Sequence, residues 1–184
     1  MKPEYEARFY DVDPATIADT LAARGATCTM PRTLMRRVIF TNHDIAERGG
    51  WLRLREQGER IFLTYKQNTA VPSAIDSVLE TELEVSDFHA TRTLLEAMGC
   101  TARRYQENYR EEWTLHGVTF DLDIWPDLRP FLEIEGTDEA AVRRGAEVLG
   151  LDFTTATFGS VDKVYLTVLD RDILTEDRLV FTSA

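Results

Sequence analysis

The sequence predicts an α+β fold built on a largely antiparallel β-sheet. Three segments have a capping residue before them, apolar residues at helical spacing within them and a glycine after them. Most of the remaining chain alternates polar with apolar residues at a period of two, which is the pattern of strands. Short connections that contain glycine, such as residues 56–59 and 116–117, are typical of hairpins between antiparallel neighbours.

The three predicted helices run from about residue 14 to 24, from 86 or 87 to 99, and from 137 to 150. Asp13 can cap the first helix, and Pro14 stands at its first helical position, where a missing N–H has no consequence. Nine alternating stretches are predicted as strands: residues 4–10, 34–41, 51–56, 60–67, 78–85, 104–115, 118–125, 130–136 and 162–168. The longest stretch without a pattern is the loop 67–77.

The chain has 184 residues and an ordinary globular composition, with 43% hydrophobic and 29% charged residues. Because no Pro- or Gly-rich linker interrupts it, we expect one domain spanning residues 1–184. The net charge of -11 argues against a nucleic-acid-coating protein, and no apolar run is long enough to cross a membrane. Cys28 and Cys100 have no CxxC partner, which favours reduced thiols and a cytoplasmic location.

The charged residues of the predicted strands share one face of each strand. The opposite face is apolar, as in residues 51–55, where two arginines alternate with two leucines. The charged faces hold Glu4, Glu6 and Arg8; Arg53 and Arg55; Lys66; Glu80, Glu82 and Glu84; Arg104 and Arg110; Asp121 and Asp123; Glu133 and Glu135; and Lys163.

Two interpretations of this face are open. It is either the solvated outer face of a sheet that packs on helices, or the inner face of a sheet curled into a barrel with a polar lumen. A solvated face normally mixes Ser, Thr, Gln and Lys, whereas this one is almost purely ionisable. Its carboxylates recur as i, i+2 pairs, about 7 Å apart on one side of a strand, and such pairs repel unless cations lie among them. The pattern therefore favours the lumen.

Such a lumen has a chemical meaning. Guanidinium forks and ammonium groups match the oxygens of a small polyanion, and carboxylates without nearby His or Cys match hard cations such as Mg²⁺ or Mn²⁺. Both sets facing one cavity suit metal-assisted phosphoryl transfer. Neither a P-loop nor a Ser/His/Asp set is present in the sequence.

The ordered motifs resemble the CYTH domain, also called the triphosphate tunnel metalloenzymes, which include class IV adenylyl cyclases, thiamine triphosphatases and inorganic triphosphatases. Residues 4–8 resemble the opening ExExK strand of that family, and residues 53–55 its RxR strand. The resemblance continues to about residue 166 through Lys66, the ExE of Glu82 and Glu84, Arg104 and Arg110, Asp123, the EIE of Glu133 and Glu135, and Lys163.

The resemblance implies an eight-stranded antiparallel tunnel with flanking helices that binds a triphosphate and needs Mg²⁺ or Mn²⁺. It implies metal ligands among Glu4, Glu6, Asp123, Glu133 and Glu135, with Glu82 and Glu84 as further ligands or water-positioning groups. Catalytic roles fall to Glu4, Glu6, Arg8 and Lys66. Phosphate contacts are implied for Arg8, Arg53, Arg55, Lys66, Arg104, Arg110 and Lys163, and Arg36 or Arg37 can add another.

Three points stay open in the sequence. The family lysine of ExExK is Arg8 here, and because arginine does not lose its proton, it can clamp phosphate but not assist proton transfer. Arg103 competes with Arg104 for the inward position. Asp121 shares the parity of Asp123 without a family counterpart, so it either supports the site or faces solvent.

The leading functional hypothesis is hydrolysis of inorganic tripolyphosphate or of an organic triphosphate. The alternatives are an adenylyl cyclase, which makes cyclic AMP and pyrophosphate from ATP, and a non-catalytic binder of polyphosphate or nucleotide. The expected partner is a small triphosphate, without nucleic acid or membrane, for a monomer or homodimer.

Overall fold

Eight antiparallel strands of the described chain form a closed barrel, which confirms the predicted fold class. The computed structural model describes residues 1–69 and 74–182. The barrel strands are β1 (Lys2–Tyr10), β2 (Thr27–Thr41), β3 (Gly50–Gln57), β4 (Arg60–Asn68), β5 (Val78–Val85), β6 (Thr101–Leu115), β7 (Val118–Ile124) and β8 (Phe131–Gly136).

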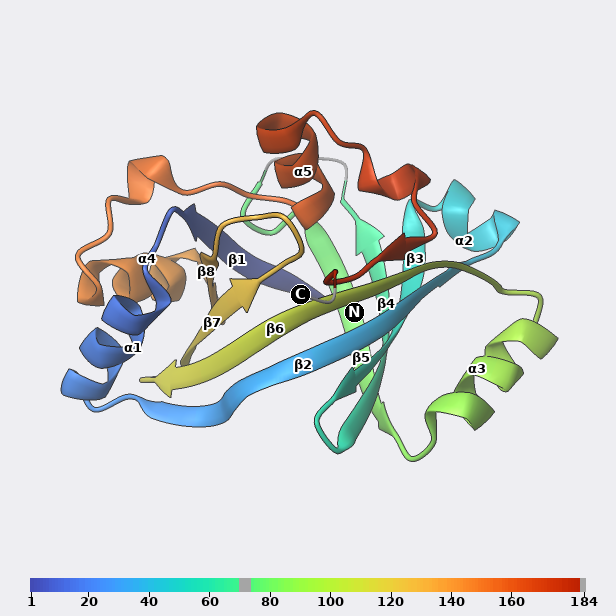
Figure 1. Cartoon of the computed structure of the whole chain (residues 1–184), viewed down its shortest axis with the longest axis horizontal. Coiled ribbons are helices and arrows are strands. Elements are labelled where there is room, and N and C mark those ends of the chain that lie inside the picture. The colour runs from blue at the N-terminus through green and yellow to red at the C-terminus, as the bar shows by residue number, and fades with distance from the viewer. Residues whose placement is uncertain (70–73, 183–184) are drawn as a thin grey trace.

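The barrel closes through two long neighbouring strands, β2 and β6, which cross the front of the molecule in Figure 1. The remaining order is β2-β3-β4-β5-β1-β8-β7-β6. A short strand β9 (Arg178–Leu179) adds to β6 in parallel, at Tyr105 and Gln106, beyond the residues of β6 that pair with β7. The segment before β9 therefore lies against an end of the barrel wall.

The three predicted helices are present, and the first has its predicted cap, Asp13. They are α1 (Pro14–Ala23), α3 (Phe88–Ala97) and α4 (Glu139–Val148), and the side chain of Asp13, Asp87 or Asp138 accepts a backbone N–H in the first turn of each. The short helix α2 (His43–Glu47), which is capped by Asn42, was not predicted from the sequence.

The predicted strand 162–168 is wrong, because these residues form helix α5 (Val161–Leu169). Val164 is buried, whereas Leu166 and Val168, which would share its face in a strand, are exposed; burial of Val164 and Tyr165 together is the apolar stripe of a helix. Asp162 lies in the first helical turn, where a carboxylate is favourable. Two other boundaries also differ, since β2 begins at Thr27 and β6 at Thr101, earlier than predicted.

Helices cover the outer face of the barrel on two sides, and the C-terminal segment covers a third area. In Figure 1, α1 and α4 lie beside β7, β8 and β1, and α3 lies on the opposite side. A large apolar cluster that includes Leu21, Phe120, Ile134 and Val142 joins the first pair of helices to the sheet. Leu95 joins α3 to β2 and β3. The apolar residues therefore pack outside the barrel, and the interior is left to the charged face.

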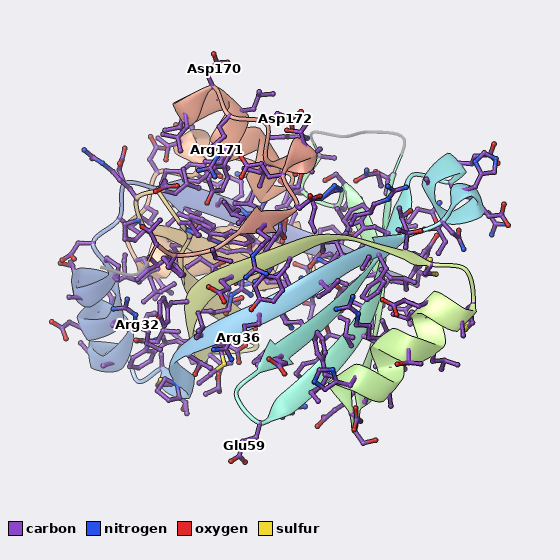
Figure 2. All side chains as sticks on the ribbon, turned by 45° about the vertical axis from the view of Figure 1, so that its right-hand side comes forward. Arg32, Arg36, Glu59, Asp170, Arg171 and Asp172 are labelled. Carbon is purple, nitrogen blue, oxygen red and sulfur yellow. The ribbon has the colours of Figure 1, made fainter. Side chains whose placement is uncertain are left out.

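The C-terminal segment 161–179 contains α5, a 3₁₀ turn (Ile173–Thr175) and β9. Tyr165 is fully buried and packs with Trp125, Phe131, Ile173 and Leu179 in a third apolar cluster. Figure 2 shows Asp170 and Asp172 at the outer edge of this segment, and Glu59 at the far end of the molecule, at the turn between β3 and β4. The loop predicted at 67–77 is shorter than expected, because β4 reaches Asn68, and its residues 70–73 lie outside the described part. Within that part, no helix is long and apolar enough to cross a membrane.

Candidate functional site

The interior of the barrel holds a cavity of about 630 Å³, and each of the eight barrel strands contributes charged side chains to it. Charged and apolar residues therefore alternate along each strand because successive side chains point alternately into the lumen and to the outer face. The predicted site residues that line the cavity are Glu4, Glu6, Arg8, Arg37, Arg53, Arg55, Lys66, Glu82, Arg104, Arg110, Asp123, Glu133 and Glu135.

Two predicted site residues lie away from the cavity. Glu84 pairs with Arg60 across β4 and β5, at 2.7 Å, with both side chains largely exposed. Lys163 is an exposed residue of helix α5 rather than of a strand. Neither lines the cavity in the described chain, so both lie apart from the other predicted site residues.

The structure also settles two choices of register. Arg37 is buried and lines the cavity, whereas Arg36 points to the outer face near Glu107. Arg104 lines the cavity, and its neighbour Arg103 is exposed. Both results follow from the pairing of β2 with β6, in which Arg37 stands opposite Gln106 and Ile39 opposite Arg104.

Arg37, Arg53 and Arg55 form an arginine cluster on β2 and β3, where Arg37 and Arg55 are direct register partners. Glu82 is the nearest carboxylate, at 3.3 Å from Arg53 and 3.6 Å from Arg55. Burial, followed by the charges of Arg53 and Arg110, lowers the pKa of Arg55 to about 9, and burial and the same kind of repulsion lower the pKa of Arg37. Among the described ion pairs, Glu82 is the only carboxylate that contacts this cluster, which leaves a local excess of positive charge.

The Nε atoms of all three arginines are buried and have no hydrogen-bond partner among the described residues. Buried donors without acceptors are unfavourable, and charged ones especially so. An anion that entered the cavity would supply both the missing acceptors and the missing negative charge. The arginine cluster is therefore built for an anionic ligand.

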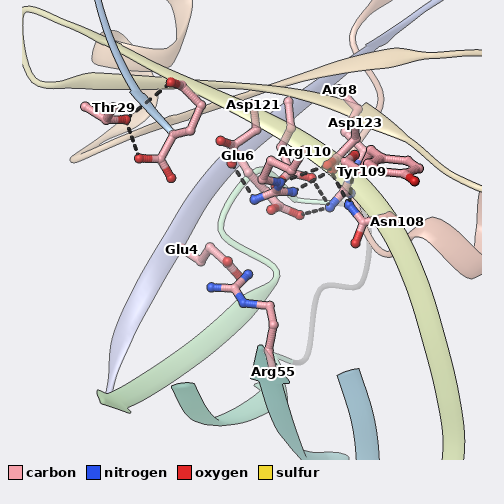
Figure 3. A network of polar contacts seen from close by, with 12 residues as sticks. Glu4, Glu6, Arg8, Thr29, Arg55, Asn108, Tyr109, Arg110, Asp121 and Asp123 are labelled. Atoms are coloured by element: carbon pink, nitrogen blue, oxygen red, sulfur yellow. Dashed lines mark hydrogen bonds and ion pairs between the residues drawn. The ribbon is translucent and has the colours of Figure 1, made fainter. Parts of the chain in front are cut away.

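A carboxylate cluster occupies the adjoining strands β1, β7 and β8. It contains Glu4, Glu6, Asp121, Asp123, Glu133 and Glu135. Figure 3 shows Glu6, Asp121 and Asp123 gathered around the guanidinium groups of Arg8 and Arg110.

Three basic side chains hold this carboxylate cluster together. Arg8 lies 2.7 Å from both Glu6 and Glu133, so that its guanidinium bridges β1 and β8. Arg110 contacts Asp121 and Asp123, each at 2.5 Å. Lys66 binds the Glu4 carboxylate at 2.7 Å, and Glu80 lies 3.4 Å from the same ammonium group.

The cations do not neutralise the carboxylates evenly. Burial would raise the pKa of Glu133, but the charges of Arg8 and Arg110 outweigh it and hold that pKa below its ordinary value. Burial and the neighbouring carboxylates Glu4, Glu133 and Glu80 raise the pKa of Glu135 to about 7. The end of the cluster nearest Glu135 therefore carries crowded negative charge that the protein does not fully compensate.

Asn108, which was not predicted as a site residue, connects the two clusters. Its side chain is fully buried, accepts a hydrogen bond from Arg37 and donates one to Asp123 over 2.9 Å. Asp123 in turn accepts from Arg110, so an amide links the arginine cluster to the carboxylate cluster. The available signal was parity, because Asn108 shares the face of Arg110 on β6.

Other cavity residues were missed or left open for the same reason. Glu80 and Gln106 line the cavity and carry the parity of their charged neighbours, but they were not proposed as site residues. Asp121, which the sequence left undecided between site and solvent, is 2% exposed and bound to Arg110. Its position favours a supporting role in the site.

The donor set fits a hard divalent cation in its chemistry. The described cavity lining contains carboxylate oxygens and neither His nor Cys, which suits Mg²⁺ or a similar ion. Within the described residues, however, no three such side chains are arranged to hold a metal as they stand, because Arg8, Arg110 and Lys66 occupy the carboxylates. The crowded charge around Glu135 marks the place where an added cation would relieve most repulsion.

Known structures with the same fold have diverged far in sequence. The PH1012 protein of Pyrococcus horikoshii OT3 is 22% identical, with a TM-score of 0.67 over 83% of this chain and 93% of its own. A candidate adenylate cyclase of Vibrio parahaemolyticus is 15% identical, with a TM-score of 0.71 over 92% of this chain and 99% of its own. HpAC1 of Hippeastrum, described as having a dominant triphosphatase activity, is 14% identical, with a TM-score of 0.56 over 96% of this chain and 100% of its own.

At these identities the structural likeness shows the fold alone. A comparison with curated protein sequences finds no match. The family model of the CYTH domain, by contrast, matches residues 3–164. That range contains all eight barrel strands, apart from the first residue of β1, and all of the charged residues that line the cavity in the described chain. The chain therefore belongs to the CYTH domain family.

Proposed function

We propose that this protein is a divalent-metal-dependent enzyme that hydrolyses a triphosphate inside the barrel. The observation that carries the proposal is that one cavity holds both an arginine cluster, whose buried Nε donors have no partner among the described residues, and a crowded carboxylate cluster. CYTH relatives include proteins described as adenylate cyclases and one with a dominant triphosphatase activity, which is consistent with triphosphate chemistry.

The basic residues would bind the phosphates. Arg37, Arg53 and Arg55 supply forked donors to the phosphate oxygens, and Arg104, Arg110 and Lys66 border the same cavity. Glu82 and Thr64 orient Arg53 through contacts of 3.3 Å. These groups would stabilise the negative charge that spreads over the transferred phosphoryl group.

The carboxylates Glu4, Glu6, Asp123, Glu133 and Glu135 would hold the divalent cation. When bound, such a cation polarises phosphoryl oxygens and neutralises charge on them. Arg8 would keep Glu6 and Glu133 in place, and because arginine stays protonated, it would not take a proton from water. In hydrolysis, a water oxygen bonds to the terminal phosphorus and the bond from that phosphorus to its bridging oxygen breaks. Orthophosphate and the remaining diphosphate, free or esterified, leave, and the proton lost by the water passes to solvent.

The experiment is phosphorus-31 NMR of the purified protein with Mg²⁺ or Mn²⁺, offered tripolyphosphate and ATP separately. Orthophosphate that appears only when the metal is present supports the proposal, and EDTA should abolish this release. Formation of pyrophosphate with cyclic AMP from ATP would overturn it in favour of a cyclase. Shifted but unconsumed phosphorus signals would overturn it in favour of a binding protein.

A variant connects the activity to the carboxylate cluster. Glu133→Gln should lower kcat/KM on the order of a hundredfold, because it removes one carboxylate beside the cation. Glu59→Gln, at the exposed turn between β3 and β4, is the matched control and should leave turnover unchanged. Equal turnover in Glu133→Gln and the control, with both variants folded by circular dichroism, would contradict the metal assignment.

A further inference from the structure

Thr64 stands in the middle of a row of three polar side chains on the inner face of the barrel. It is the register partner of Arg53 on β3 and of Glu82 on β5. The residue is 0% exposed and, unlike its two partners, does not belong to the described residues that line the cavity. Any effect of Thr64 on a ligand must therefore pass through Arg53 or Glu82.

The hydroxyl of Thr64 connects these two charged side chains. It donates a hydrogen bond to Oε2 of Glu82 over 2.7 Å and accepts one from Nη2 of Arg53 over 3.3 Å. Because a hydroxyl has one proton and two lone pairs, donation to Glu82 leaves its oxygen free to accept from Arg53. A neutral side chain thus satisfies one oxygen of the carboxylate that lies nearest to the arginine cluster.

Glu82 contacts the arginine cluster only loosely. Its Oε2 lies 3.3 Å from Arg53 and 3.6 Å from Arg55. Its contact with the neutral Thr64 hydroxyl is shorter, at 2.7 Å. Elsewhere in the cavity, a carboxylate oxygen lies 2.5–2.7 Å from each of three cations, Arg8, Lys66 and Arg110. Glu82 is therefore held at a distance that close ion pairs of the same cavity do not keep.

A carboxylate that could turn freely would not stay at this distance. Arginine and carboxylate groups commonly form two parallel hydrogen bonds of about 2.7–2.9 Å. The Glu82 side chain is 31% exposed, so packing alone does not fix it. Such a close pair would neutralise a guanidinium group in a cluster whose buried Nε donors have no partner among the described residues.

We infer that Thr64 is a positioning residue, which holds Glu82 back from Arg53 and Arg55 and so keeps both guanidinium groups available to an anionic ligand. At its present distance the carboxylate still offsets part of the repulsion among the three arginines. Glu82 thereby serves the arginine cluster rather than the carboxylate cluster. The inference rests on the proposed function, because it takes the arginine cluster as the site of the phosphates.

Three variants separate the hydroxyl of Thr64 from its shape. Calorimetry with Mg²⁺ measures binding of the bis-methylene analogue of tripolyphosphate, in which carbon replaces both bridging oxygens and prevents cleavage. Thr64→Val should weaken binding about tenfold, because the released Glu82 neutralises a guanidinium group. Thr64→Ser keeps the hydroxyl and should bind within about twofold of the wild type. Thr81→Val, which removes a hydroxyl from an exposed position of β5, is the matched control and should bind as the wild type does.

A second background tests the route through Glu82. The Glu82→Gln side chain has no charge with which to neutralise an arginine, so adding Thr64→Val to it should change the affinity by less than about twofold. Circular dichroism checks that each variant is folded. An equal loss in both backgrounds, an unchanged affinity in Thr64→Val, or a loss in Thr64→Ser as large as in Thr64→Val would overturn the inference and leave the proposed function standing. A wild-type protein that does not bind the analogue would overturn both.

Discussion

A single uncharged residue, Asn108, determines how the charges of its two neighbours are arranged in this barrel. Asn108 carries no charge, yet it lies between Arg37 and Asp123 and satisfies both. A carboxylate at this position would neutralise Arg37, and an apolar side chain would leave Arg37 without an acceptor. The amide therefore keeps Arg37 both oriented and positively charged toward the cavity.

This role gives a prediction for Asn108→Asp. The new carboxylate should pair with Arg37, repel Asp123 and lower the affinity for tripolyphosphate at least about tenfold, with a loss of about 1–3 kcal/mol in the free energy of unfolding. Calorimetry and urea denaturation measure the two effects. Adding Arg37→Gln to this variant should cause little further loss of affinity, because the charge is already neutralised. Full additivity of the two substitutions would contradict the proposed link.

At the residue scale, sequence could predict which side chains face inward but not which of them meet. Strand parity placed Glu4, Arg55 and Glu133 on the charged face, and all three line the cavity. Parity carried no information on the pairing of Arg8 with Glu133, because that contact depends on the register between β1 and β8. Residues without charge, such as Asn108, gave no signal of their own.

At the scale of elements, local signals were reliable where they were redundant. The helices at 14, 88 and 139 each had an aspartate cap, periodic apolar residues and a following glycine, and all three are present. The prediction of a strand at residues 162–168 was wrong because a short apolar run of this kind fits both the two-residue period of a strand and the 3.6-residue period of a helix. The decisive information was tertiary, since Tyr165 packs against Trp125 and its neighbours while Leu166 and Val168 stay exposed.

Helix α4 approaches the barrel closely at a glycine. A Cβ atom on Gly145 would lie 2.8 Å from Cγ2 of Ile134 and 3.0 Å from Cγ1 of Val118. Both neighbours belong to strands that carry cavity residues on their other face. The contact thus sets the distance between the helix and the wall that holds Glu133 and Asp121.

We predict that Gly145→Ala lowers the free energy of unfolding by about 1–3 kcal/mol, although alanine favours helix by about 1 kcal/mol in isolation. The reason is overpacking, because the neighbouring side chains belong to the buried core. Denaturant unfolding measures the change, and Glu147→Ala, at an exposed position of α4, is the control. A Gly145→Ala protein as stable as the wild type would show that the helix can move away at no cost.

The whole molecule is acidic, and so is its cavity. Among the described residues that line the cavity, ten carboxylates stand beside seven Arg and Lys side chains. A polyanion alone would add to this negative excess, and a divalent cation alone would have to compete with Arg8, Lys66 and Arg110 for carboxylates. Each ligand therefore supplies the charge that the other needs.

Metal and triphosphate should consequently bind with positive coupling. We predict that saturating Mg²⁺ raises the affinity for an uncleavable tripolyphosphate analogue by about 5–150-fold, and that the analogue raises the affinity for Mg²⁺ by the same factor, since linkage is reciprocal. Calorimetry in both orders measures the two factors. Binding of the analogue that is equally tight in EDTA would contradict the charge argument.

The pairing of β2 with β6 has a consequence for how the protein folds. These two strands lie far apart in sequence and close the barrel, and they bring Arg37 to Asn108 across the closing seam. Pairings between strands distant in sequence form slowly in folding. The arginine cluster, which we propose binds phosphates, therefore gains its Asn108 partner only once this seam has closed, and a polyanion that bound the cluster would favour the closed barrel over forms in which the seam is open.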